Sequence, residues 1–139
     1  MELKMDAGAL NTLMQTEFPQ VATDYIVETV VPMEVTVRLP VADRHLRPGG
    51  TISGPTMFSL ADVSIYLATM AMIGPVTLAV TTNCSIDFMR KPAAGVDLIA
   101  TARLLKLGRL LAVGDVLIHS EGMKAPVARA SLTYAIPPK

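Results

Sequence analysis

Hydrophobic and polar positions along the chain predict two helices of different character. Over residues 3–18, apolar side chains recur at spacings of three and four, which predicts an amphipathic helix within an N-terminal region of residues 1–20. Residues 55–73 are apolar nearly all round, and such a helix is expected to be buried. Pro55 suits the first position of this second helix, and Gly74-Pro75 ends it.

The rest of the chain is rich in β-branched residues and predicts strands. One strand is expected over residues 26–39, bent near Pro32, and a loop containing several glycines and prolines follows at residues 40–54. A meander of four further strands is expected within residues 76–136, at 76–88, 96–107, 109–121 and 124–136. Their short connections favour antiparallel pairing, because a parallel crossover needs about a dozen residues or more.

These elements predict one domain of class α+β that spans residues 1–139. An antiparallel sheet with one face wrapped around the long central helix accounts for the order of the elements. A chain of 139 residues is long enough to bury a core without disulfides or metals.

The composition adds three constraints. Hydrophobic residues make up 51% of the chain and the mean hydropathy is +0.46, which favours some apolar surface that a partner copy covers. The formal net charge is zero without a basic block, so the charge pattern does not favour nucleic acid as a partner. A single cysteine excludes an intrachain disulfide, and with no secretory signal visible we expect a cytoplasmic protein.

Asp62 lies in the middle of the apolar run 55–73. A charge there would cost roughly 3 kcal/mol in a membrane, so we predict a buried core helix that does not enter a membrane. Aspartate is almost never fully buried without a partner. Two interpretations are open: a serine or a backbone group satisfies the carboxylate, or the carboxylate performs chemistry or contacts a ligand.

Gly54 ends a glycine-rich stretch, residues 48–54, that leads into the same helix. It can serve as a turn or capping glycine, or its N–H and the positive helix end can polarise a bound oxygen. No metal site or cofactor is expected, because His45 and His119 each lack a second histidine at metal spacing and Cys84 is alone.

Four segments together resemble PaaI-type acyl-CoA thioesterases, which have the hotdog fold. The resemblance covers about residues 30–136 and rests on Gly50–Asp62 with its Leu60-Ala61-Asp62 end, Phe88–Gly95, Leu107–Ala112 and Val127–Ala130. It implies a hotdog fold, hydrolysis of acyl-CoA, and a homodimer or a homotetramer built as a dimer of dimers. One departure is that Ser53-Gly54-Pro55 stands where the family often has His-Gly-Gly.

The resemblance also implies roles for three residues. Asp62 would be the general base or the nucleophile, and the Gly54 N–H would polarise the thioester carbonyl. Thr81 of the neighbouring subunit would lie near the carboxylate and orient the attacking water. Thr82 and Asn83 are adjacent, and a bulge would change which of the three side chains faces the site.

Further substrate contacts are expected at positions around these three. Ser59 lies one turn before Asp62 and could hold its carboxylate, and Tyr66 lies one turn after it and could line the acyl pocket. Basic residues at predicted turns could meet the phosphates of coenzyme A. The full expected set is Ser53, Ser59, Tyr66, Asn83, Arg90, Lys91 and Arg109.

Two other functions remain open on the sequence. One is a non-catalytic hotdog protein that binds acyl-CoA, an alternative that the missing histidine supports. The other is a hotdog hydratase or dehydratase, which would need a histidine paired with an acid. Neither His45 nor His119 falls on the buried helix, which disfavours the latter.

Overall fold

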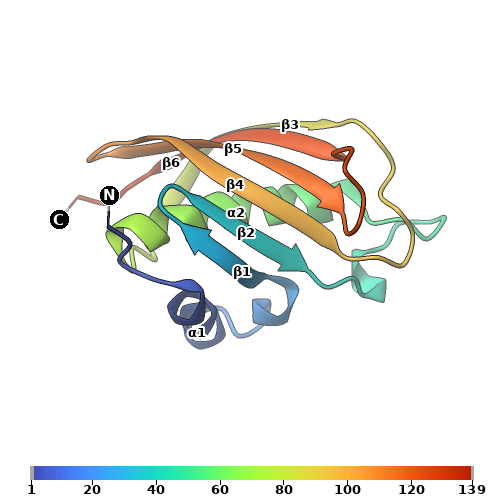
Figure 1. Ribbon diagram of the computed structural model, residues 1–139, viewed down its shortest axis with the longest axis horizontal. Coiled ribbons are helices and arrows are strands. Elements are labelled where there is room, and N and C mark those ends of the chain that lie inside the picture. The colour runs from blue at the N-terminus through green and yellow to red at the C-terminus, as the bar shows by residue number, and fades with distance from the viewer. Residues whose placement is uncertain (1, 139) are drawn as a thin grey trace.

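The computed structural model describes residues 2–138, so Met1 and Lys139 of the predicted domain lie outside the described residues. Two α-helices, two short 3₁₀ turns and six strands follow one another along the chain (Figure 1). Their bounds are α1 Ala7–Glu17, η1 Ala22–Asp24, β1 Ile26–Val31, β2 Glu34–Leu39, η2 Asp43–His45, α2 Gly54–Ile73, β3 Val80–Phe88, β4 Leu98–Leu107, β5 Leu111–Ser120 and β6 Ala128–Ala135.

The six strands form one antiparallel sheet that wraps around α2, so the predicted α+β hotdog architecture is confirmed. The strand order is β1-β2-β4-β5-β6-β3. Figure 1 shows the sheet curving over α2, with α1 outside the β1–β2 hairpin. Helix α2 is therefore the centre of the domain, and the sheet positions everything that contacts it.

Two strand predictions were wrong. Residues 26–39 form a hairpin, because Met33 at φ 69° reverses the chain after Pro32 and pairs Val31 with Glu34. The four-strand meander includes only β4, β5 and β6, because β3 pairs with β6 and not with β4. The connection 89–97 passes β6 and β5 to reach β4 in the interior of the sheet, and β3 is an edge strand.

Helix α2 is held in the core along most of its length. It is long and apolar enough to cross a membrane, but 67% of the apolar window is buried within the domain, as predicted. Its buried hydroxyls are satisfied locally, since Ser64 donates to Leu60 O at 2.6 Å and Thr69 donates to Ile65 O at 2.8 Å. Asp62 is the one charged residue of the helix.

Gly114 of β5 allows the sheet to approach α2 closely. A Cβ at this position would lie 2.6 Å from Ile65 Cδ1 and 2.7 Å from the Arg103 carbonyl oxygen. Neither distance is tolerable for a side chain, so only glycine permits this contact between sheet and helix.

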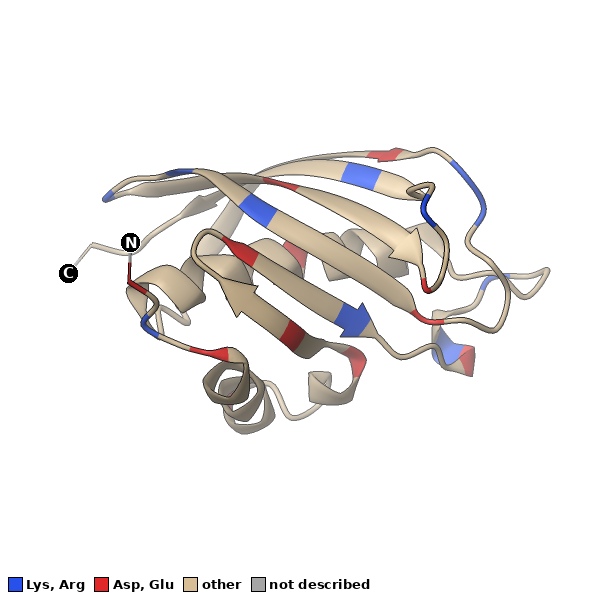
Figure 2. Ribbon diagram, in the orientation of Figure 1, with Lys and Arg blue, Asp and Glu red and all other residues tan. Residues whose placement is uncertain are grey.

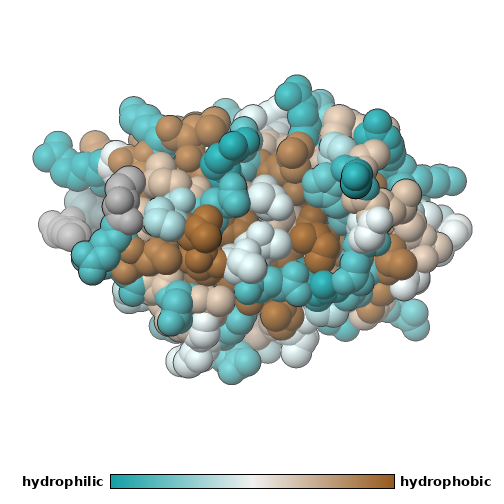
Figure 3. Space-filling view, viewed as in Figure 1, coloured by the Kyte–Doolittle hydropathy of each residue, from teal (hydrophilic) through white to brown (hydrophobic). Residues whose placement is uncertain are grey.

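The surface carries charges of both signs and scattered apolar groups. Lysine, arginine, aspartate and glutamate are distributed over strands and loops without a large block of one sign (Figure 2). Hydrophobic residues reach the surface in several places between polar ones (Figure 3). Among the exposed apolar side chains, Val80 and Phe88 of the edge strand β3 are 57% and 52% exposed.

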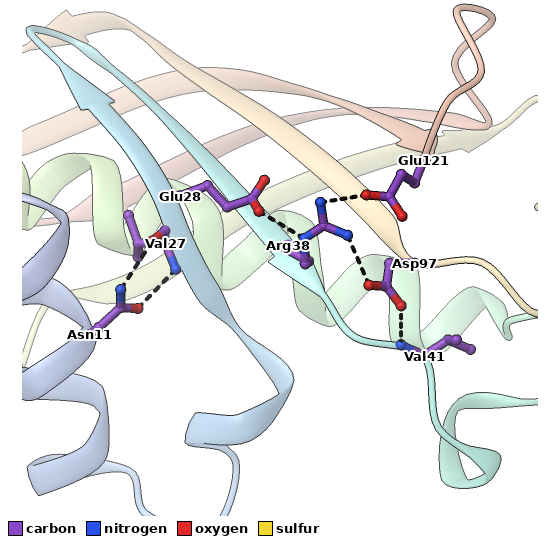
Figure 4. Close-up of polar contacts among 7 residues, drawn as sticks. All are labelled: Asn11, Val27, Glu28, Arg38, Val41, Asp97 and Glu121. Atoms are coloured by element: carbon purple, nitrogen blue, oxygen red, sulfur yellow. Dashed lines mark hydrogen bonds and ion pairs between the residues drawn. The ribbon is translucent and has the colours of Figure 1, made fainter.

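Arg38 joins three segments at one end of the sheet (Figure 4). Its guanidinium binds Glu28 of β1 at 2.8 Å, Asp97 at 2.9 Å and Glu121 at 2.6 Å, and these carboxylates raise the pKa of Arg38. Asp97 also accepts a hydrogen bond from Val41 N at 2.9 Å. The cluster fixes the start of the loop that leads toward α2.

Asp97 is expected to make stability depend on pH. The N–H of Val41 and the Arg38 guanidinium lower the pKa of Asp97 in the folded protein. Ionised Asp97 therefore stabilises the fold above its ordinary pKa of about 4, and this contribution is lost as the pH falls through the lower folded value. Urea denaturation should show Asp97→Asn less stable than wild type near pH 7. The difference should shrink steadily toward about pH 2, and a constant difference would contradict this explanation.

Candidate active site

Asp62 projects from α2 to two hydroxyl groups of the sheet. Its Oδ1 accepts hydrogen bonds from Thr81 Oγ1 at 2.5 Å and from Tyr134 Oη at 2.7 Å. Within residues 2–138, no side chain or backbone group donates to Oδ2. The carboxylate is half-buried, so one oxygen is held while the other is open.

The register of two strands explains why both hydroxyls reach the same oxygen. Thr81 of β3 lies directly opposite Tyr134 of β6, and the register shifts by one residue immediately afterwards, at Thr82. Thr82 instead donates to Thr133 O at 3.3 Å, while Asn83 is exposed. The bulge thus leaves Thr81 facing α2. Thr81 and Asp62 belong to the same chain, whereas the prediction had Thr81 come from a neighbouring subunit.

Burial keeps Tyr134 as a hydrogen-bond donor. The side chain is 4% exposed, and this burial, together with the nearby Asp62 carboxylate, raises the pKa of Tyr134 well above its ordinary value. Its ring packs on Tyr66 with centroids 5.9 Å apart, and Tyr66 donates to Thr77 O at 2.9 Å. The phenol therefore stays protonated, and able to donate, at neutral pH.

An apolar cavity opens beside the carboxylate. It has a volume of about 440 Å³, and Asp62, Thr81 and Tyr134 form its polar side. Its apolar walls come from α1, the segment after it, α2 and the segment around the start of β3, at Met14, Phe18, Val21, Val63, Tyr66, Ala79 and Val80. Tyr66 thus lines the cavity next to Asp62, where the sequence placed it.

Gly54 is the first residue of α2 and lines a different cavity. Ser53 caps the helix, accepting from Thr56 N at 3.3 Å. The Gly54 N–H belongs to the first helical turn, which has no intrahelical acceptor, and no hydrogen bond from it is found within residues 2–138. The Phe88 ring lies 3.4 Å from where a Gly54 Cβ would be.

The cavity beside Gly54 is cationic. Its volume is about 430 Å³, and three basic residues line it: Arg47, Arg90 and Lys91. Arg90 also donates to Pro126 O at 2.7 Å. Two of the basic residues predicted to meet phosphates therefore lie together at the helix N-terminus, and Arg47 joins them.

Gly54 and Asp62 cannot act on one group within a single chain. They are separated by eight positions of α2, which is about 12 Å along the helix axis. Their cavities share no lining residue. The expected arrangement, with Gly54 and Asp62 of one chain and Thr81 of another, is therefore wrong: Asp62 and Thr81 belong together, and Gly54 stands apart.

Other predicted positions lie away from the carboxylate. Ser59 lines a smaller cavity of about 240 Å³ with Tyr25 and His45, and it does not bind Asp62. Arg109 lines a cavity of about 600 Å³ next to Ile73, at the opposite end of α2 from Gly54. Among the described residues, no group of three His, Cys, Asp or Glu side chains could hold a metal ion.

Tyr134 and Arg47 were missed in the sequence. A buried tyrosine needs a partner for its hydroxyl, so Tyr134 in a strand predicted to cover the helix was a signal for a polar contact. Arg47 lies among the prolines and glycines of the loop 40–54, where nothing in the sequence pattern distinguishes it from a solvated charge.

Comparisons with known proteins agree on one family. Residues 49–127 match the family model of the thioesterase superfamily. The chain is similar to a candidate esterase from Pseudomonas aeruginosa, with 30% identity over 104 residues, which are 75% of this chain and 76% of that protein.

Solved structures extend the likeness over nearly the whole chain. A candidate thioesterase from Silicibacter sp. TM1040 is 56% identical, with a TM-score of 0.92 over 99% of this chain and 96% of that one. The E. coli PaaI protein, from the phenylacetic acid degradation operon, is 25% identical, with a TM-score of 0.80 over 94% of this chain and 93% of that one. The chain therefore belongs to the thioesterase superfamily, as a thioester hydrolase with a PaaI-like hotdog fold.

Proposed function

We propose that the protein hydrolyses acyl-CoA thioesters at sites shared between two copies of the chain. The observation that carries the proposal is the Asp62 carboxylate, which has one open oxygen at the edge of an apolar cavity. A carboxylate in this setting can act as a base or a nucleophile, while the cavity offers room for an acyl group.

The edge strand β3 supports a two-copy site. Within residues 2–138 of one chain, β3 pairs only with β6, so the backbone groups along its other edge have no strand partner there. Most side chains of β3 are exposed. If two β3 edges pair antiparallel about a two-fold axis, the Thr81 end of one meets the Phe88 end of the other. Since Thr81 contacts Asp62 and Phe88 contacts Gly54, this pairing brings Asp62 of one copy near Gly54 of the other.

Hydrolysis in such a site has two routes. In the first, Asp62 takes a proton from a water whose oxygen attacks the thioester carbon. The carbonyl oxygen gains negative charge beside the Gly54 N–H of the second copy. The C–S bond then breaks with its electron pair on sulfur, and the proton passes from Asp62 to the thiolate.

In the second route Asp62 attacks the carbon itself. The C–S bond breaks with its electron pair on sulfur, which gives a mixed anhydride and a thiolate that takes up a proton. Water then hydrolyses the anhydride, which frees the acid and restores the carboxylate. Both routes use the same carboxylate and the same backbone donor.

The basic cavity supports coenzyme A as the thiol. Arg47, Arg90 and Lys91 lie together beside Gly54, and charge-assisted contacts to phosphates are strong. The apolar cavity beside Asp62 would take the acyl group. The substrate would thus extend from one copy's apolar cavity across the shared site to the other copy's basic residues.

Thiol release from two matched substrates tests the coenzyme A part. An acyl-CoA is compared with the same acyl group on pantetheine, which lacks the nucleotide phosphates. Losing charge-assisted contacts should raise KM by roughly 10-fold to 100-fold in wild type. Lys91→Gln should reduce the difference in KM between the two substrates. Arg103→Gln, on the outer face of the sheet, should leave that difference unchanged. Equal kcat/KM for both substrates would show that the protein does not recognise the nucleotide of coenzyme A. That result would not contradict the proposal that it hydrolyses thioesters.

A further inference from the structure

We infer that Tyr134 is a positioning residue, which fixes the Asp62 side chain so that Oδ2 is the oxygen that reacts. The inference rests on the proposed function, because it assigns an orientation to the carboxylate that performs the hydrolysis. Tyr134 lies outside residues 49–127, the segment that matches the superfamily model.

Tyr134 ties the Asp62 side chain to its own main chain. The phenol hydroxyl lies 2.7 Å from Asp62 Oδ1 and 3.0 Å from the main-chain carbonyl oxygen of Asp62. One proton shared between these two acceptors favours a single rotamer of the carboxylate. On a half-buried helix position, a free aspartate would otherwise sample several.

The two carboxylate oxygens are consequently different. Oδ1 accepts from Thr81 and Tyr134, so its lone pairs are engaged by two hydroxyl donors. Oδ2 accepts from none of residues 2–138. An oxygen with free lone pairs can take a proton or attack carbon, whereas Oδ1 would first have to give up a hydrogen bond.

The scaffold holds the phenol firmly enough for this role. Tyr134 lies in β6 between β5 and β3, opposite Ala112 on one side and Thr81 on the other. Its ring is buried and packs on Tyr66. Strand pairing on both sides and ring packing fix the hydroxyl relative to α2, and a group on a rigid element positions its partner more accurately than one on a loop.

Tyr134→Phe removes the hydroxyl and keeps the ring. Loss of one hydrogen bond to a charged group should lower kcat for acyl-CoA hydrolysis by roughly 10-fold to 100-fold, with KM little changed. A wild-type kcat, or a loss of kcat/KM that comes entirely from a raised KM, would overturn the inference.

Tyr25→Phe is the matched control. Tyr25 is also buried, at 7% exposure, but its hydroxyl makes no hydrogen bond to Asp62. Tyr25→Phe should therefore keep the wild-type kcat and KM, because it removes a buried hydroxyl without changing the hydrogen bonds of the Asp62 carboxylate. If both variants lost activity equally, the effect would be structural and the inference wrong.

Asp62→Asn, assayed in parallel, separates the inference from the proposed function. Wild-type activity in Asp62→Asn would refute the proposed mechanism. An inactive Asp62→Asn together with a fully active Tyr134→Phe would refute only the role of Tyr134.

Discussion

Asp62→Asn is expected to lower kcat for acyl-CoA hydrolysis by about 10²-fold to 10⁴-fold while the protein stays folded. The amide has nearly the same shape, and its oxygen can still accept from Thr81 and Tyr134. It offers no basic or nucleophilic oxygen in the open position. Thiol release at saturating substrate measures the loss, and thermal denaturation measures the fold.

Asp87→Asn is a suitable control for that experiment. Asp87 also lies near the sheet edge, in β3, but it is exposed and pairs with Arg129 at 2.9 Å. This variant should stay folded, because exposed ion pairs contribute little to stability. It should also keep the wild-type kcat, because Asp87 lines neither of the two cavities that form the proposed site. An Asp62→Asn protein as fast as Asp87→Asn would show that the carboxylate does not catalyse the reaction.

Gly54→Pro is expected to lower kcat by about 10²-fold to 10³-fold, because proline removes the N–H that would bind the developing oxyanion. Proline is tolerated in the first turn of a helix, and Ser53, at φ −75° and ψ 155°, already has the extended conformation that a following proline requires. The fold should therefore survive. The same thiol-release assay reports the loss.

Gly54→Ala separates the N–H from the side chain at this position. Alanine keeps the N–H, and its Cβ would lie 3.4 Å from the half-exposed ring of Phe88, which is ordinary contact. Gly54→Ala should thus retain most of the activity that Gly54→Pro loses. If the two variants lost activity to the same extent, crowding against Phe88 would explain the effect and the backbone donor would not.

The central helix could be predicted from the sequence because the signals for it are local. A run of apolar residues between Pro55 and Gly74 specifies a buried helix, and the one charge inside it draws attention to Asp62. The strand order could not be predicted in the same way. Pairing of β3 with β6 joins segments about 50 positions apart, and hydrophobic alternation does not distinguish that neighbour from β4.

The surroundings of Asp62 depended on the same long-range pairing. Thr81 reaches Asp62 because it lies opposite Tyr134 and because the bulge at Thr82 follows it. A shift of one position would have turned Thr82 inward instead. The separation of Gly54 and Asp62, by contrast, could have been predicted from the sequence. The two residues are eight positions apart on one helix, and the rise per residue fixes their distance along its axis.

A mixture of two inactive variants tests the shared site most directly. Asp62→Asn and Gly54→Pro chains are combined in equal amounts under conditions that exchange subunits, and mixed dimers are verified with two affinity tags. Each mixed dimer would contain one intact site, so the mixture should recover about one quarter of wild-type activity. If verified mixed dimers remained as inactive as the separate variants, Asp62 and Gly54 of different copies would not form one active site.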